Sequence, residues 1–325
     1  MKETASSLLI VIVNYRTPQL TIDCLNSLFP EIQSLASTQA IIVDNYSGDR
    51  SVEQIQEAID TQNWHNWVSI IASNHNGGFA FGNNLAIRSI LESESPPAYV
   101  LLLNPDTIVL SGAIKSLIDF MEQHPKVGIA GSRLESLDGS IQHSAFRFHS
   151  IWSELDRGLQ LGIVTKLLSK WVVAFTIPTT QCQIDWVSGA SFLIRQEVFE
   201  SVGLMDEEYF MYYEEVDFCL QAKRMGWSCW YVPESRVIHL VGQSSGVDQP
   251  NTTPKRLPQY WFNSRRRYFI KNHGWWYAAV ADLFWLSGFI SWKIRSILQK
   301  KSIAHPPQIL RDFWQNSVFI TRLTD

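Results

Sequence analysis

The stretch LLIVIVNY, residues 8–15, contains an apolar run that is typical of a buried β-strand. Three similar runs follow: AIIVDN at residues 40–45, VSIIAS at residues 68–73 and YVLLLNPD at residues 99–106. Helix-like segments near residues 19–28, 51–59 and 82–92 alternate with them. Short strands that alternate with helices predict an α/β fold with a mostly parallel central sheet flanked by helices.

Each of the four runs leads into polar residues, among them Asn14, Asp44, Asn74 and Asp106. In an open α/β sheet, ligands bind outside the carboxyl ends of the strands. We therefore expect these side chains to face one binding site. The alternative stays open that each is polar only because the chain reaches the surface there.

The composition indicates a globular protein. The chain has 325 residues, 46% hydrophobic and 18% charged, which is enough for one or two cores and excludes a disordered chain. The four cysteines have no CxxC spacing, so we expect neither a disulfide framework nor a zinc site. The apolar run from Leu8 to Val13 is followed by no cleavage pattern, which favours a first strand over a signal peptide. A cytoplasmic location is expected.

The segment NHNGGFAFGNN, residues 74–84, is rich in glycine and precedes a helix. It matches neither GxGxxG nor GxxxxGK[ST], which excludes a Rossmann dehydrogenase and a P-loop protein. Its glycines suit backbone N–H groups that approach an anionic ligand. A plain surface loop is the alternative.

Asp106 and His239 are candidates for a metal site. In LLLNPDT, residues 101–107, Pro105 ends the strand and Asp106 follows it, where a carboxylate can hold Mg²⁺ together with substrate phosphates. His239 ends another apolar run, and a neutral imidazole there would complete the coordination. The alternatives are a helix-capping aspartate and a structural histidine.

Six acidic residues fall within twelve positions around the stretch YFMYYEEVDFCLQAKRMGW, residues 209–227. A helix is predicted over residues 216–225, and its dipole favours negative charge in the first turn, which accounts for one acid but not for six. Crowded carboxylates beside aromatic side chains raise one another's pKa, and a carboxylate with a raised pKa is a better proton acceptor near neutral pH. Glu215 is therefore a candidate general base.

Residues 274–292, GWWYAAVADLFWLSGFISW, carry a single charge, Asp282. Residues 255–301 have ten Lys or Arg against that one acid, a local balance of +9 in a chain of net charge −4. This pattern favours an interfacial helix on an anionic membrane surface. A helix packed on the core or on a partner, and a membrane span, are the alternatives; Asp282 counts against the span. An acidic body without a binding motif argues against nucleic acid.

Six segments occur in this order: IVNY, VDNYSGD, NGGFAFGNN, LLLNPDT, GASFLIRQEVFESVGLMDEEYFMYYEEVDFCL and VIHLVGQSS. Together they resemble glycosyltransferase family 2, in its rhamnosyltransferase-like branch of bacterial surface polysaccharide synthesis. The resemblance covers about residues 8–245. It implies a GT-A type nucleotide-diphospho-sugar transferase fold over residues 1–246. Residues 247–325 are then a basic, aromatic, helical extension that associates with the membrane.

The resemblance also implies the reaction. A rhamnose-like sugar moves with inversion from a dTDP- or UDP-sugar to a hydroxyl of a glycan or of a polyprenyl-diphosphate-linked glycan, with Mg²⁺ or Mn²⁺ as cofactor. The enzyme is then cytoplasmic and peripherally associated with the inner face of the plasma membrane. Arg265, Arg266 and Arg267 are candidates for contacting the lipid diphosphate.

The resemblance assigns roles residue by residue. Asp44 recognises the pyrimidine base, Asp106 and His239 hold the metal, and Glu215 is the base. The residues implied to contact the nucleotide are Asn14, Tyr15, Asp44, Asn76, Gly77, Gly78, Asn83, Asn104 and Asp106. Gly189, Ala190 and Glu214 are implied to border the acceptor. The chain departs from the family pattern at Glu215, where an aspartate is usual, and at Asn104, which replaces the first carboxylate of a DxD motif.

A second hypothesis is a catalytically silent nucleotide-binding scaffold at the membrane, with Glu215 as the inactivating substitution. A sugar-nucleotide pyrophosphorylase is disfavoured because it would need a basic glycine-rich loop near the N-terminus, and none is present.

Overall fold

The computed structural model describes residues 7–33, 35, 37–91, 93–240, 254–300 and 305–321. The strands of its central sheet are β1 (Leu8–Asn14), β2 (Thr38–Asp44), β3 (Val68–Ala72), β4 (Tyr99–Leu103), β5 (Thr107–Val109), β6 (Val127–Glu135), β7 (Ile141–Gln142), β9 (Cys182–Ile184), β11 (Ser191–Arg195) and β12 (Ser228–His239). Their order is β3-β2-β1-β4-β11-β6-β12-β5, with β7 beside β6 and β9 beside β12. A second sheet pairs β8 (Ala145–Phe146) with β10 (Trp186–Val187).

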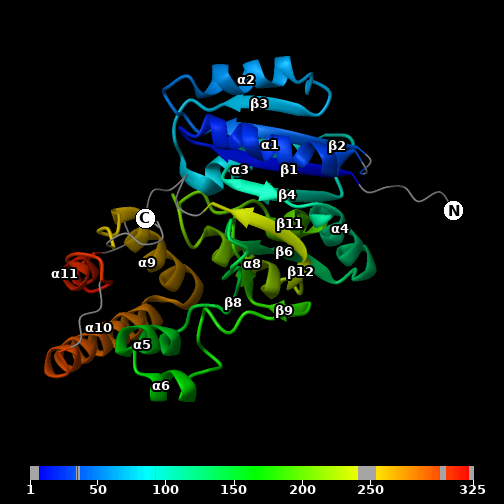
Figure 1. Ribbon diagram of the computed structural model, residues 1–325. Coiled ribbons are helices and arrows are strands. Elements are labelled where there is room, and N and C mark those ends of the chain that lie inside the picture. Colours follow the sequence, from blue (N-terminus) through cyan, green and yellow to red (C-terminus); the bar gives the residue numbers. More distant parts are fainter. Residues whose placement is uncertain are drawn as a thin grey trace.

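The helices lie on both sides of this sheet and at one end of the molecule. They are α1 (Pro18–Ile32), α2 (Ser51–Thr61), α3 (Gly78–Leu91), α4 (Ala113–Gln123), α5 (Ile151–Leu159), α6 (Gly162–Leu167), α7 (Gln196–Val202), α8 (Glu214–Arg224), α9 (Gln259–His273), α10 (Trp275–Leu298) and α11 (Ile309–Gln315). Figure 1 shows α5, α6 and α10 gathered at the end of the molecule opposite to α2 and β3.

The first four strands of the main sheet are parallel, as predicted. β1 pairs with both β2 and β4, and β2 pairs with β3. Beyond β4 the sheet is mixed, because β11 is antiparallel to both of its neighbours, β4 and β6. The carboxyl ends of the four parallel strands therefore lie at one edge of the sheet. Loops from the mixed half of the sheet also reach this edge.

Both faces of the sheet are covered, and this explains the uninterrupted apolar run in β1. Leu9 and Val11 belong to one buried cluster. Leu8, Ile10 and Ile12 belong to another. Because successive side chains of a strand point to opposite faces, a strand between two cores is apolar at every position.

The sequence suggested a pair of strands in residues 228–240, but the structure has one long strand, β12. Its parallel register with β6 shifts between Val232 and Arg236, around Pro233, which has no N–H to donate to a partner strand. Ser235 fills the irregularity, where its hydroxyl lies 2.8 Å from that of Ser132. Beyond the shift, β12 also pairs with β5, opposite Thr107–Val109.

The helical pattern predicted in residues 150–180 is two short helices, α5 and α6. Ser150 caps the start of α5 in a capping box, and Gln160 adopts a left-handed conformation after its end. α5 packs closely on α10 through two glycines. A Cβ atom at Gly158 would lie 2.5 Å from the Trp285 carbonyl oxygen, and one at Gly288 would lie 2.8 Å from the Leu159 nitrogen.

The C-terminal helices share a core with the sheet. One buried cluster contains Leu9 of β1 together with Tyr268 of α9 and Ala278 of α10. The predicted domain boundary at residues 246 and 247 lies outside the described residues. In the part of the chain that the structure describes, no helix has the length and apolar character needed to cross a bilayer.

Buried ion pairs explain the charges of this region. Arg265 of α9 donates to Glu154 of α5 at 2.7 Å and to Asp282 of α10 at 2.5 Å, and all three side chains are buried. Arg266 is buried too, and Arg267 binds Asp206. The expectation that Arg265, Arg266 and Arg267 contact a lipid diphosphate is therefore wrong, because their guanidinium groups are bound to other residues of this chain.

Candidate active site

The ends of β1 and β2 are tied together by hydrogen bonds. Asn14 donates to the Asp44 carboxylate at 2.8 Å. Ser47 donates to the same carboxylate through its hydroxyl at 2.5 Å and its backbone N–H at 3.0 Å. Asn14 and Asp44 are buried. These side chains form a rigid polar floor at the edge where ligands bind in such sheets.

Two exposed aromatic rings flank this floor. Tyr15 follows β1 and is 37% exposed, and Tyr46 follows β2 and is 56% exposed. The Arg16 guanidinium lies 5.1 Å from the Tyr15 ring centre, and its Nε donates to the carbonyl oxygen of Ser47. The two rings have faces on which a nucleotide base can stack. The sequence analysis missed Tyr46; its place directly after the second strand was the available signal.

The glycine-rich loop is joined to the same edge through Asn45. Asn45 donates to the Asn76 side chain at 3.0 Å and to the Gly78 carbonyl at 2.9 Å. The backbone N–H groups of Gly77, Gly78 and Phe79 all donate within the protein, to Asn45, Asn76 and Phe210 respectively. The prediction that the glycine N–H groups are presented to an anion is therefore wrong for this conformation.

The structure gives another reason why residue 78 is a glycine. It has a φ of +89°, and a Cβ atom there would lie 1.9 Å from the Phe210 carbonyl oxygen. Only glycine allows this approach between α3 and residues 203–213, the acidic loop that joins α7 to α8. Asn83 is buried and donates to the Phe79 carbonyl four residues earlier, so its contact with a nucleotide stays a prediction.

Asp106 and His239 are neighbours because β5 and β12 pair in antiparallel fashion, with Thr107 opposite His239. The Asp106 Oδ1 and His239 Nε2 atoms lie 3.4 Å apart. Two groups at this separation can face one cation, and Mg²⁺ sites often take their other oxygens from substrate phosphates and water. No cluster of three or more His, Cys, Asp or Glu side chains suited to a metal occurs among the described residues. The pair therefore fits a cation shared with a diphosphate.

The predicted acceptor loop lies beside this pair. The Asn104 N–H donates to the Ala190 carbonyl at 3.0 Å, since β11 pairs with β4. A Cβ atom at Gly189 would lie 3.4 Å from the Phe79 ring and 4.0 Å from Glu215 Oε1. The loop thus brings the start of α3, the end of β4 and the start of α8 together.

Glu214 and Glu215 open α8 and differ from the other acids of this region. Burial raises the pKa of Glu215 to about 7. Burial, and then the neighbouring charge of Glu215, raise the pKa of Glu214 well above its usual value. The Oε2 atom of each carboxylate is buried without a hydrogen-bond partner among the described residues. A carboxylate in this state is poised to accept a proton near neutral pH.

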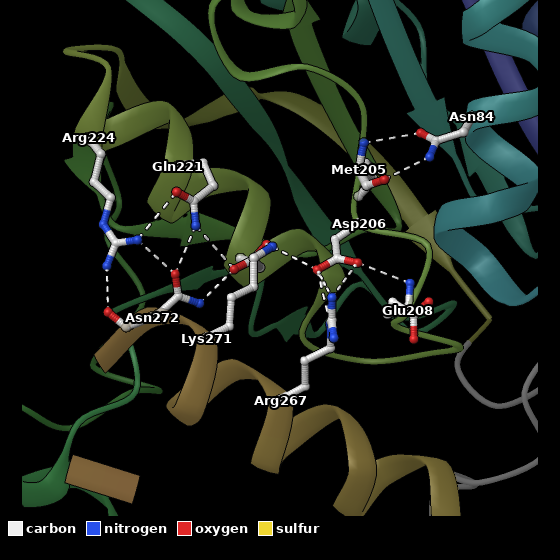
Figure 2. Close-up of polar contacts among 10 residues, drawn as sticks. Asn84, Met205, Asp206, Glu208, Gln221, Arg224, Arg267, Lys271 and Asn272 are labelled. Atoms are coloured by element: carbon white, nitrogen blue, oxygen red, sulfur yellow. Dashed lines mark hydrogen bonds and ion pairs between the residues drawn. The ribbon is translucent and has the colours of Figure 1, made fainter. Parts of the chain in front are cut away.

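The remaining acids do not raise these pKa values by crowding, contrary to our expectation. Asp206 binds Arg267 and Lys271 (Figure 2). Asp217 binds Lys271 and Asn272. Glu207 accepts from Asn84 and Arg88. Burial raises the pKa of Asp206, but the hydrogen bond and charge of Lys271 outweigh it and hold that pKa below its usual range.

Contacts link the end of β2, the glycine-rich loop, the loop at Gly189 and the start of α8. Asp44 and Asn45 follow β2, and Asn45 holds the loop that leads to Phe79. Phe79 and Glu215 meet at Gly189. Asn74, also predicted to face this edge, is exposed, and its side chain lies 2.8 Å from the His75 ring nitrogen.

Comparison with known proteins gives relatives over most of the chain. A model of the family described as "Glycosyltransferase like family 2" matches residues 5–268. The N-acetylglucosaminyl-diphospho-decaprenol L-rhamnosyltransferase of Mycobacterium tuberculosis is 30% identical over 188 residues, 56% of this chain and 58% of that protein. The dTDP-rhamnosyl transferase RfbF of Shigella flexneri is 26% identical over 275 residues, 82% of this chain and 81% of that protein.

Among solved structures, GalNAc-T7 with UDP, GalNAc and Mn²⁺ superposes with a TM-score of 0.59 at 14% identity. The match covers 97% of this chain and 55% of that one. The mannosyltransferase PcManGT from Pyrobaculum calidifontis, in complex with GDP-Man and Mn²⁺, superposes with a TM-score of 0.52 at 12% identity, over 97% of this chain and 70% of that one. At these identities the likeness is one of fold.

Proposed function

The chain belongs to the glycosyltransferase-like family 2, and from that premise we propose that it moves a rhamnose-like sugar from a dTDP- or UDP-sugar to a hydroxyl group with inversion. The fold is the GT-A type, and the enzyme class is glycosyltransferase. The finer assignment is supported by relatives that are named as rhamnosyltransferases. The single observation that carries the chemistry is Glu215, a half-buried residue beside Gly189 whose Oε2 atom is buried and whose pKa burial raises to about 7.

The proposed step is a direct displacement. The acceptor hydroxyl gives its proton to Glu215 while its oxygen forms a bond to the anomeric carbon. The bond from that carbon to the diphosphate oxygen breaks, and its electron pair leaves with the nucleoside diphosphate. Because a single displacement attacks the opposite face, the anomeric configuration inverts. Burial and the charge of Glu215 raise the pKa of Glu214, which disfavours a second negative charge beside the base.

Asp106 and His239 are proposed to hold a divalent cation. A bound Mg²⁺ or Mn²⁺ would supply positive charge against the negative charge that develops on the leaving diphosphate. The 3.4 Å between Asp106 Oδ1 and His239 Nε2 supports this role. GalNAc-T7 and PcManGT, whose structures contain Mn²⁺, share the fold, which supports such a cofactor for this chain.

The nucleotide is proposed to bind over the ends of β1 and β2. Asp44 and Asn14 form the floor, and the exposed rings of Tyr15 and Tyr46 are positioned for stacking on a base. Gly189 and Ala190 are proposed to border the acceptor, because they adjoin Glu215 and Asn104.

The acceptor is proposed to be a glycan or a polyprenyl-diphosphate-linked glycan, presented at the inner face of the plasma membrane to a cytoplasmic, peripherally bound enzyme. The outer face of α10 supports this. Its exposed face carries the apolar side chains Trp276, Val280, Leu283, Ile290, Ile294 and Ile297, three or four residues apart except where the exposed Ser287 interrupts the series. Asp282, the only acid of α10, is buried, while Lys293 is exposed beside this stripe. An apolar stripe with cations and no exposed acid suits an anionic bilayer.

Vesicle sedimentation tests the membrane contact. We expect the protein to pellet with vesicles that contain phosphatidylglycerol and not with pure phosphatidylcholine. The double variant Ile294→Glu, Ile297→Glu should stay in solution with both. Leu137→Glu, which charges an exposed leucine outside α10, is the matched control and should pellet as the wild type does. If both variants pellet equally with the phosphatidylglycerol vesicles, the proposed contact between α10 and the membrane is wrong.

Donor hydrolysis tests the enzymatic assignment against a silent nucleotide-binding scaffold. A panel of dTDP-, UDP- and GDP-sugars is incubated with and without Mn²⁺, and release of the nucleoside diphosphate is measured. Metal-dependent release from a dTDP- or UDP-sugar is expected. Tight binding of a nucleoside diphosphate without release from any donor would favour the scaffold.

A further inference from the structure

Helix α9 binds the acidic loop that leads into α8 through hydrogen bonds and an ion pair. The Ser264 hydroxyl donates to the Met211 carbonyl at 2.9 Å. Arg267 makes a two-pronged contact with the Asp206 carboxylate, with its Nε at 3.0 Å and a terminal nitrogen at 2.9 Å. Figure 2 shows Arg267 and Lys271 of α9 reaching toward Asp206 from the same side. The helix therefore contacts the loop near its beginning, at Asp206, and near its end, at Met211.

Lys271 joins the beginning of this loop to the first turn of α8. Its ammonium group lies 2.7 Å from Asp206 and 2.6 Å from Asp217. Asn272 donates to the other oxygen of Asp217 at 2.6 Å. Asp217 is 2% exposed, and charged hydrogen bonds at such a site are strong and directional. Asp217 stands two residues after Glu215, so α9 fixes the helix turn that carries the proposed base.

The backbone before Glu214 needs such support. Tyr212 and Tyr213 have φ values of +69° and +70°, a left-handed conformation that is unfavourable for two successive aromatic residues. The Tyr213 ring packs on Tyr268 of α9, with ring centres 5.5 Å apart. The Tyr212 ring stacks near Tyr260, which is also in α9. Residues in strained conformations persist only where their surroundings hold them.

We propose that α9 positions the base: through Lys271, Arg267 and Ser264 it holds the acidic loop and the first turn of α8 so that Glu215 faces the acceptor. These three are positioning residues, because they contact the loop and Asp217 rather than Glu215. The inference rests on the proposed function, and it gives the C-terminal region a part in turnover that is separate from membrane contact.

The variant Lys271→Met tests this inference, with Lys223→Met as its matched control. Lys223 is an exposed lysine of α8 that pairs with Asp185 at 2.8 Å and lies over the Phe148 ring, and both of these partners are outside the loop. We expect Lys271→Met to lower kcat for hydrolysis of dTDP-rhamnose by about 10- to 100-fold, since small displacements of a reacting group are costly. The Kd for dTDP should change by less than about twofold, because the loop is not the nucleotide floor.

A second variant separates positioning from stability. Lys271→Met leaves Asp217 buried without its lysine, which would itself destabilise the protein. The double variant Lys271→Met, Asp217→Asn removes that charge, so its Tm should recover while its kcat stays low, because the tether is still absent. If kcat returns together with Tm, the lysine is merely structural and the inference is overturned.

Two further outcomes are decisive. If Lys271→Met and Lys223→Met have equal kcat, α9 does not position the base. If Glu215→Gln retains turnover, the proposed function itself fails. If Glu215→Gln is inactive while Lys271→Met is fully active, only the positioning inference fails. An unfolded Lys271→Met protein leaves the decision to the double variant.

Discussion

At the ends of β1 and β2 the polar side chains are hydrogen-bonded to one another, whereas at the start of α8 two carboxylates are buried with unsatisfied oxygen atoms. Asp44 accepts from Asn14 and Ser47. Glu214 and Glu215 each keep a buried Oε2 atom without a partner among the described residues. The first region is the proposed donor end of the site, and the second is the proposed base end.

This difference between the two regions suits two different proposed roles, donor binding at the first and proton transfer at the second. A carboxylate that accepts several hydrogen bonds is held rigidly, which suits a binding floor. A buried polar group without a partner costs about 1–3 kcal/mol, so it persists only where other contacts stabilise the fold. Near neutral pH such a carboxylate can both accept and release a proton. The donor end is therefore built for stability and the base end for reactivity.

The largest effect is expected at the base end. Glu215→Gln keeps the size of the side chain but cannot accept the proton, so turnover should fall by about 10²- to 10⁴-fold. The Kd for dTDP, measured by titration calorimetry, should be unchanged. Glu208→Gln, a change of the same kind at an exposed position of the acidic loop, is the control and should remain active. Near-normal turnover of Glu215→Gln would move the base elsewhere.

Asp106→Asn should affect binding and turnover together. Losing one charged ligand is expected to weaken Mn²⁺-dependent donor binding by about 10- to 100-fold or more, which is the loss typical even of groups that only orient a metal ligand. Titration of a nucleoside diphosphate with and without Mn²⁺ measures it. Asp119→Asn, at an exposed ion pair with Lys115, provides the control. A variant that binds the donor normally but turns over slowly would contradict a shared cation.

The donor end should respond through stability and affinity rather than through kcat. Asp44→Ala removes the acceptor of Asn14 and Ser47, and leaving buried donors unsatisfied costs about 1–3 kcal/mol. We expect a lower free energy of unfolding in urea and a raised donor KM, with kcat nearly unchanged at saturation. A fall in kcat with unchanged KM would show that the two ends are not separate.

The smallest effect is expected at Glu214. Because Glu215 accepts a proton only when ionised and its pKa is raised to about 7, turnover should increase as pH rises through about 7. Burial and the charge of Glu215 raise the pKa of Glu214, whereas burial alone raises that of Glu215. Glu214→Gln should therefore leave the midpoint of the pH–rate profile in place. A clear downward shift would show that Glu214 already carries charge in this range.

Much of the fold was predictable because its signals are local. The alternation of apolar runs and helical segments fixed the parallel strands β1 to β4, and six ordered motifs predicted the family and the GT-A type, both of which are confirmed. β12 was wrongly divided in two, since Pro233 interrupts the pattern while the strand continues in a shifted register. Pairing partners distant in the sequence leave no local trace.

The sequence predicted which residues form the site better than it predicted their pKa values and their ion pairs. The sequence singled out Glu215 among six acids through the crowding of carboxylates beside aromatic side chains and through the family resemblance. The reason for its raised pKa, burial without a cation, could not be predicted, because the cations that bind Asp206 and Asp217 come from a helix more than fifty residues away. The three arginines of α9 were misassigned to lipid for the same reason.

The sequence by itself determined the alternation of strands and helices in the first half, the family and the positions of the acids, since each depends on spacing along the chain. Only the tertiary structure decided which acids are neutralised and which remain reactive. It also decided that α10 buries Asp282 and turns an apolar stripe outward. Both outcomes depend on desolvation and on charges that come together only after folding, and neither is a property of a residue and its neighbours in sequence.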